Sequence, residues 1–179
     1  MDRGYIYLNK KSFLHNLEVL KNLSRKELCL VVKANAYGHG LEWAVKNAKE
    51  SGIKWFAVAS VDEGIQVKKV YEESRVLLLA EPSKSQLENI KENEIDLTVY
   101  NESFIDTLIE TGDEYSVHLK IDTGMHRLGC PPEKFYDLYK KIVDSDLNLI
   151  GICTHFPMAD TDETETKKSI ELFEKTISD

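Results

Sequence analysis

Short apolar runs recur along the chain and alternate with amphipathic segments. The runs are rich in Val, Ile and Leu, and they cover residues 28–34, 55–60, 75–80, 97–100, 116–122 and 149–156. Near-continuous apolar runs of this length are typical of parallel strands that are buried on both faces. The pattern therefore predicts six parallel strands.

The segments between the runs carry apolar residues at helical spacing. Helical stripes are formed by Leu41, Ala44, Val45 and Ala48, by Phe104, Ile105, Leu108 and Ile109, and by Phe135, Leu138, Tyr139 and Ile142. Ser83 and Gln86 have the spacing of a capping box that opens a further helix. Gly52 suits a helix C-terminus and Pro132 suits the first turn of a helix. Helices are thus predicted between the strands.

The order of these elements predicts an α/β fold. Strand ends near residues 34, 60, 80, 100 and 122 are about 20 to 26 residues apart, which is the period of βα units. An open doubly wound sheet and a (β/α)8 TIM-type barrel both fit this order. A barrel of eight units needs about 250 residues, so this chain would hold about six of them. Residues 1–24 should form a strand, Tyr5 to Leu8, and a helix, Ser12 to Leu23, that lead into the barrel part at residues 25–179.

Composition and charge narrow the classes of function. The net charge of −8 argues against a general nucleic-acid binder, because such proteins gain affinity from cationic contacts to phosphate. No apolar run approaches the ~18 residues of a membrane span. Cys29, Cys130 and Cys153 are widely spaced and form no Cys-x-x-Cys pair, which indicates buried thiols in a reducing cytoplasm. The acidic residues from Asp160 to Glu165 are explained by the first turn of a helix, so no metal site is predicted.

Polar residues follow the predicted strands, and the first of them is a lysine. Lys33 leaves the apolar run Cys29–Val32, where burial would disfavour the ammonium form and leave an amine nucleophile suited to Schiff-base chemistry. The alternative is a lysine whose stem lies along the strand end while its amine reaches solvent. Lys120 lies near the end of the fifth run and His155 near the end of the sixth. Because the active sites of βα-barrels lie at the C-terminal ends of the strands, these side chains are candidate site residues.

Three segments of the chain resemble a known family. Residues 31–40, Val-Val-Lys-Ala-Asn-Ala-Tyr-Gly-His-Gly, resemble the pyridoxal-phosphate lysine motif of alanine racemases residue for residue. Residues 119–129 are similar to the second signature of that family, and residues 151–160 are similar to the third. Residues 5–17 and 56–64 are similar as well, so the resemblance covers essentially the whole chain.

The resemblance implies an enzyme. Alanine racemases interconvert L-alanine and D-alanine with pyridoxal 5′-phosphate, where the cofactor is the electron sink and the protein supplies bases and orientation. A homodimeric cytoplasmic isomerase that takes a small amino acid and supplies D-alanine for the peptidoglycan of the cell wall is therefore expected. A serine or broad-specificity amino-acid racemase is one alternative, and a non-catalytic pyridoxal-phosphate carrier of the same barrel superfamily is another.

The resemblance also implies roles for five residues. Lys33 would hold the cofactor and act as one of two catalytic bases. Tyr37 would hydrogen-bond the cofactor phosphate, and His155 would lie against the pyridine ring. Arg127 would contact the phenolic oxygen of the cofactor and the substrate carboxylate, since a planar guanidinium suits a pair of oxygens. Lys120 is often carbamylated in the family and positions this arginine; an ordinary buried lysine is the alternative.

The second catalytic base of the family is a tyrosine in a β-rich C-terminal domain. We expect that domain, and the last barrel units, to be absent from these 179 residues. Lys33 would then exchange a proton on one face of the substrate only, so efficient racemisation by this chain alone is not expected.

Overall fold

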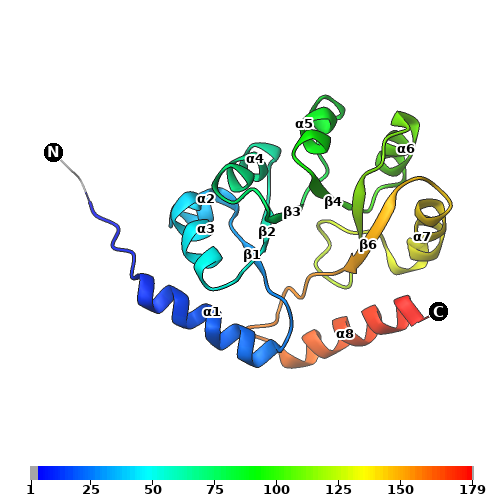
Figure 1. Ribbon diagram of the computed structural model, residues 1–179. Coiled ribbons are helices and arrows are strands. Elements are labelled where there is room, and N and C mark those ends of the chain that lie inside the picture. Colours follow the sequence, from blue (N-terminus) through cyan, green and yellow to red (C-terminus); the bar gives the residue numbers. More distant parts are fainter. Residues whose placement is uncertain (1–3, 179) are drawn as a thin grey trace. The chain divides into compact units, whose positions relative to one another are not determined.

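The computed structural model describes residues 4–178 (Figure 1). The chain divides into two compact units, residues 1–95 and residues 96–179. In both units, strands and helices alternate along the chain. None of the helices described is both long and apolar enough to cross a membrane.

The first unit contains three parallel strands. Its elements are α1 (Lys10–Ser24), β1 (Cys29–Val31), α2 (Lys33–Tyr37), α3 (Leu41–Glu50), β2 (Trp55–Val58), α4 (Val61–Val70), β3 (Arg75–Leu78), the 3-10 turn η1 (Lys84–Gln86) and α5 (Leu87–Glu92). Strand β2 lies between β1 and β3, with Phe56 opposite Leu30 on one side and Val76 on the other. The carboxyl ends of the three strands therefore meet at one edge.

The second unit repeats this arrangement. Its elements are β4 (Ile95–Val99), whose first residue is the last of the first unit, α6 (Glu102–Thr111), β5 (Ser116–Lys120), the 3-10 turn η2 (Pro132–Lys134), α7 (Phe135–Val143), β6 (Asn148–Cys153) and α8 (Glu163–Ser178). Strand β5 pairs in parallel with β4 and with β6, and the register with β6 shifts between Val117 and His118. Its strand ends also lie at one edge.

The six strands lie within or next to the six predicted runs, so the prediction of alternating strands and helices is confirmed. Burial follows the prediction in β2 to β5, where most strand residues are buried. Strands β1 and β6 are only partly buried. Within the described residues each of these two strands pairs with a single neighbour, which leaves part of its surface uncovered.

The predicted strand at Tyr5–Leu8 is wrong. Residues 4–9 have no regular secondary structure, and the Tyr5 and Tyr7 side chains are each 89% exposed. An extended segment needs a neighbouring strand to bond its backbone groups, and none of the described residues pairs with it. The helix that follows is confirmed as α1, and the Asn9 side chain accepts a hydrogen bond from the Ser12 amide at its start, 3.1 Å away.

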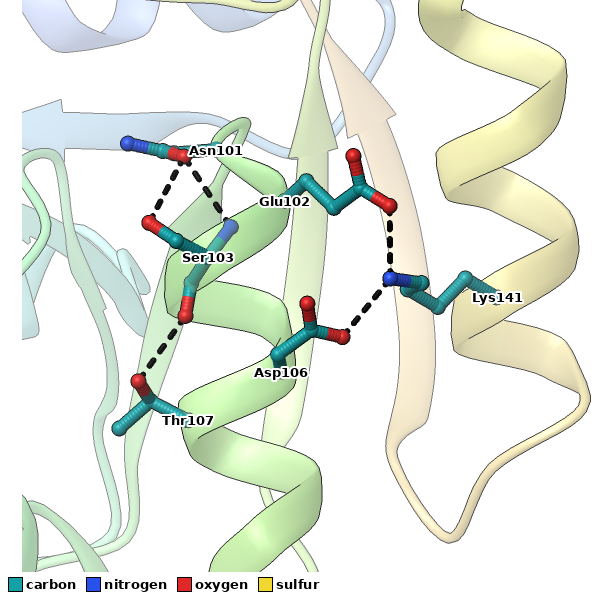
Figure 2. A network of polar contacts seen from close by, with 6 residues as sticks. All are labelled: Asn101, Glu102, Ser103, Asp106, Thr107 and Lys141. Carbon is teal, nitrogen blue, oxygen red and sulfur yellow. Dashed lines mark hydrogen bonds and ion pairs between the residues drawn. The ribbon is translucent and has the colours of Figure 1, made fainter.

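Side-chain caps mark the N-terminal ends of two helical segments. Ser83 and Gln86 form the predicted capping box, which opens η1 ahead of α5. Asn101 caps α6 by accepting hydrogen bonds from the Ser103 amide, at 3.2 Å, and from the Ser103 hydroxyl, at 3.1 Å (Figure 2).

Helices α6 and α7 are joined by Lys141. Its ammonium lies 2.7 Å from a carboxylate oxygen of Asp106 and 2.7 Å from one of Glu102 (Figure 2). Hydrogen bonds to Asp106 and Glu102 raise the pKa of Lys141 above its ordinary value. Because the three side chains are substantially exposed, water screens this network and its contribution to the free energy of unfolding is small.

Gly112 and Gly129, two of the three described glycines of the second unit with a positive φ, have very different surroundings. Gly112 ends α6 with φ 69°, and a Cβ built on it meets nothing within 4 Å. Gly129 has φ 133°, and a Cβ there would lie 2.6 Å from the Asp122 amide nitrogen and 2.8 Å from the Ile121 carbonyl carbon. Backbone atoms cannot rotate away as a flexible side chain can, so Gly129 allows residues 121–130 to fold back on themselves.

Alanine substitutions at Gly112 and Gly129 should separate the cost of a left-handed backbone from the cost of a steric clash. Gly112→Ala should cost about 1 kcal/mol of unfolding free energy, which is the penalty of a left-handed residue. Gly129→Ala adds overpacking against backbone and should cost roughly 3 kcal/mol or more. Urea denaturation of both variants measures the difference, and equal losses would show that the close approach at Gly129 is not a constraint.

Candidate functional site

The predicted site residues all lie at or just beyond the carboxyl ends of strands. Lys33 and Tyr37 follow β1 in the first unit. In the second unit Lys120 is the last residue of β5, Arg127 lies in the loop after it, and His155 lies two residues beyond β6. Strand ends of this kind carry the active sites of βα-barrels.

The turn that carries Lys33 and Tyr37 has an unusual backbone. Ala34, Asn35, Ala36 and Tyr37 have φ between 51° and 54°, so four consecutive residues other than glycine are left-handed. Such a conformation costs about 1–2 kcal/mol per residue, or on the order of 4–8 kcal/mol for the four. Strain of this kind persists where surrounding contacts determine it, and it is concentrated at functional sites. The pattern of apolar and polar residues does not predict this conformation.

Two polar side chains hold this turn. The Glu63 carboxylate accepts a hydrogen bond from the Ala34 amide, 2.6 Å away, and another from the Ala59 amide, 3.0 Å away. The Asn35 side-chain oxygen accepts one from the Leu41 amide at 2.8 Å. Because the residue before Leu41 is Gly40, which has no side chain, Asn35 takes the place of an N-cap for α3. The turn is thereby fixed to β2 on one side and to α3 on the other.

The side chains of Lys33 and Tyr37 lie near each other. The Lys33 Nζ is 6.0 Å from the centre of the Tyr37 ring. Lys33 is half-buried, and the Tyr37 side chain is 61% exposed. An amine and a phenol hydroxyl therefore project from the same turn and can both be reached by a ligand. The structure brings together the two residues predicted for the first unit.

Arg127 lies in a loop shaped by Asp122. The Asp122 carboxylate accepts hydrogen bonds from the amides of Gly124 and His126, each 3.0 Å away. Partial burial opposes ionisation of Asp122, but the hydrogen bonds from Gly124 and His126 outweigh it and lower the pKa of the carboxyl below its ordinary value. The Arg127 guanidinium is exposed and forms no ion pair with another described residue, so it is available to an anionic ligand.

Lys120 and Cys153 are neighbours in the β5–β6 register. Lys120 is 8% exposed, so its side chain is buried at this strand end, and its carbamylation stays a prediction. Burial raises the pKa of the Cys153 thiol to about 11, against the opposing effect of the Lys120 charge. Burial likewise raises the pKa of the Cys130 thiol to about 11, which keeps both thiols protonated and unreactive near neutral pH. His155 lies two residues beyond Cys153 and is exposed to solvent.

Hydroxyl groups connect the strand exits of the second unit to α8. The Thr154 hydroxyl donates to the Ile121 carbonyl at 2.9 Å and lies 2.7 Å from the Thr123 hydroxyl. The buried Ser169 of α8 donates to the Thr123 carbonyl at 2.9 Å. Sequence reasoning assigned no role to these residues or to Glu63. Only the Ser60-x-x-Glu63 spacing offered a signal, and it resembles an ordinary helix cap.

Alternating parallel strands and helices, with a lysine at a strand exit, are typical of βα-barrel proteins that bind ligands at their strand ends. The family model described as "Alanine racemase, N-terminal domain" matches residues 8–179. The chain belongs to this family, whose members depend on pyridoxal phosphate.

Known relatives support this assignment. An alanine racemase of Treponema denticola is 35% identical over 172 residues, which cover 90% of this chain and 45% of the relative. An amino-acid racemase of Enterococcus faecalis is 35% identical over 182 residues, covering 98% of this chain and 26% of the relative. The solved structure of an alanine racemase from Clostridium difficile has a TM-score of 0.85 at 29% identity, over 94% of this chain and 49% of that one.

These likenesses confirm the predicted TIM-type barrel fold, with its parallel strands and surrounding helices. The chain spans about half the length, or less, of the relatives it matches. Of the two folds that the strand spacing allowed, the comparisons support the barrel and not the open doubly wound sheet.

The stabilising contribution of the loop that carries Arg127 should decrease at low pH. Because the pKa of the Asp122 carboxyl is lowered in the folded state, its ionised form stabilises the fold above the ordinary aspartate pKa, and this contribution is lost as the pH falls below it. Asp122→Asn removes the charge and should be less stable than the wild type at pH 7, with the gap closing towards pH 3. Urea denaturation at both pH values measures the gap, and a gap that stays constant would contradict the predicted role of the charge.

Proposed function

We propose that this chain is the lysine-bearing part of a pyridoxal-phosphate-dependent alanine racemase. The observation that carries the proposal is the half-buried Lys33 beside the exposed Tyr37, on a strained turn at a strand end. Membership of the alanine racemase family supports it. The proposed reaction interconverts L-alanine and D-alanine and supplies D-alanine for peptidoglycan.

The donor set fits pyridoxal phosphate. Its aldehyde requires an amine, which Lys33 offers, and its phosphate requires hydrogen-bond donors, one of which is the Tyr37 hydroxyl. When bound, the cofactor supplies an electron sink for the bond that breaks at the α-carbon of the substrate. The proposed role of Lys33 is to hold the cofactor and to move the α-proton on one face.

Three residues of the second unit also have proposed roles, which follow from membership of the family. The proposed role of Arg127 is to pair with the substrate carboxylate and the phenolic oxygen of the cofactor, as its exposed guanidinium allows. His155 is assigned to the pyridine ring. Lys120, buried at the end of β5, is assigned to the positioning of Arg127, in the carbamylated form.

The proposal extends to the setting of the enzyme. A racemase of this family needs a second base on the opposite face of the substrate, so we assign its source to a β-rich domain outside residues 1–179, in a homodimer. The proposed location is the cytoplasm. The net charge of −8 supports a small-molecule substrate rather than nucleic acid or an anionic membrane surface.

Cofactor binding tests the role of Lys33. The protein with pyridoxal phosphate should show the absorbance band of a lysine-bound cofactor, and borohydride should fix the cofactor on the Lys33 peptide found by mass spectrometry. Lys33→Ala should lose both signals. Lys46→Ala is the matched control, because Lys46 is an exposed lysine paired with Glu42 on α3. Equal labelling of the Lys33→Ala variant and the wild type would overturn the proposal.

The substrate is tested by comparing L-alanine with L-serine. The amino-acid racemase of Enterococcus faecalis makes a broader specificity the second candidate. D-amino-acid formation by the protein in its encoded form should be at least about tenfold faster from L-alanine, because a serine hydroxyl that is buried without a hydrogen-bond partner costs about 1–3 kcal/mol. Comparable rates would favour the broader enzyme. Bound cofactor with no turnover of either substrate would favour a carrier.

A further inference from the structure

Glu63 connects two strand exits of the first unit. Its carboxylate oxygens bind one backbone amide each: Oε1 lies 2.6 Å from the amide of Ala34, and Oε2 lies 3.0 Å from the amide of Ala59. Ala34 is the residue directly after Lys33, and Ala59 follows the end of β2. The carboxylate therefore ties the turn that carries Lys33 to the neighbouring strand.

The position of Glu63 resembles that of a helix-capping residue, but its side chain is used elsewhere. Ser60 is the N-cap of α4, and its hydroxyl accepts a hydrogen bond from the Glu63 amide at 3.3 Å. In a capping box the glutamate would return to the amide of the N-cap residue. Here it reaches past Ser60 to Ala59 and across to Ala34. The contact with Ala34 does not stabilise helix α4.

The left-handed turn depends on contacts such as this one. The other hydrogen bonds of its backbone come from residues 32–41, including the one from the Ala36 amide to the Val32 carbonyl at 2.8 Å. Among the described residues, Glu63 provides the one side-chain hydrogen bond to this turn from outside that segment. The turn has four consecutive residues with positive φ, so loss of an outside anchor should let it relax.

We propose that Glu63 is a positioning residue for Lys33. By holding the amides of Ala34 and Ala59, its carboxylate fixes the left-handed turn and so the direction in which the Lys33 amine and the Tyr37 hydroxyl project. The inference rests on the proposed function, because it takes Lys33 as the residue that holds pyridoxal phosphate. It assigns Glu63 no contact with substrate or cofactor.

Glu63→Gln tests the inference with little change of volume. The glutamine oxygen can accept from one amide, but its NH2 group then faces the second amide, donor against donor. The matched control is Asp62→Asn, because Asp62 is an exposed carboxylate in the same first turn of α4. Both variants are made in the protein as it is encoded, and Glu63→Asp, which keeps the charge but is shorter, serves as a second variant if Glu63→Gln does not fold.

The first readout is hydrogen exchange without cofactor. Glu63→Gln should raise amide exchange in peptides covering residues 32–40 roughly tenfold, as expected for one lost hydrogen bond, while peptides from the second unit and the melting temperature stay close to the wild type. Asp62→Asn should leave all peptides unchanged. Unchanged exchange at residues 32–40, or a uniform rise along the chain with a lower melting temperature, would overturn the inference.

The second readout is the lysine-bound cofactor. Glu63→Gln should raise the dissociation constant for pyridoxal phosphate roughly tenfold and lower the fraction of Lys33 fixed by borohydride, and Asp62→Asn should do neither. Wild-type labelling at Lys33 with no change in Glu63→Gln would overturn the inference and leave the proposed function intact. Labelling that is independent of Lys33 would overturn the proposed function and the inference with it.

Discussion

The left-handed turn from Ala34 to Tyr37 is the constraint on which the first unit depends. It reverses the chain directly after a parallel strand and places an amine and a phenol close together, with the Lys33 Nζ 6.0 Å from the Tyr37 ring centre. A right-handed turn would be easier to form but would send these side chains in other directions. The unfavourable backbone is therefore tied to the site, and the hydrogen bonds of Glu63 and Asn35 offset part of its cost.

In the second unit, a different set of contacts shapes the loop that follows a strand. Its loop after β5 closes through Gly129, where a side chain would meet backbone atoms, and through the Asp122 carboxylate, which gathers the amides of Gly124 and His126. Hydroxyl contacts of Thr123 fix this exit to β6 and to α8. In both units a carboxylate that accepts backbone amides shapes the loop that presents a cation.

Much of the fold could be predicted from the sequence, because buried parallel strands require apolar runs and these recur along the chain. The six strands, the Ser83 capping box and the position of Lys33 just beyond the end of β1 all follow from local patterns. The strand at Tyr5–Leu8 could not be judged locally, because a strand exists only with a partner. The hydrogen bonds of Glu63 could not be predicted for a related reason: its contact with Ala34 joins residues 29 positions apart.

The most direct measurement is a crystal structure of the protein, in its encoded form, with pyridoxal phosphate. Electron density should be continuous between the Lys33 Nζ and the cofactor, with Ala34 to Tyr37 at positive φ and the Glu63 carboxylate on the Ala34 amide. Cofactor attached to another residue, or a right-handed turn after Lys33 that leaves Glu63 apart from Ala34, would contradict the link between the strained turn and the site.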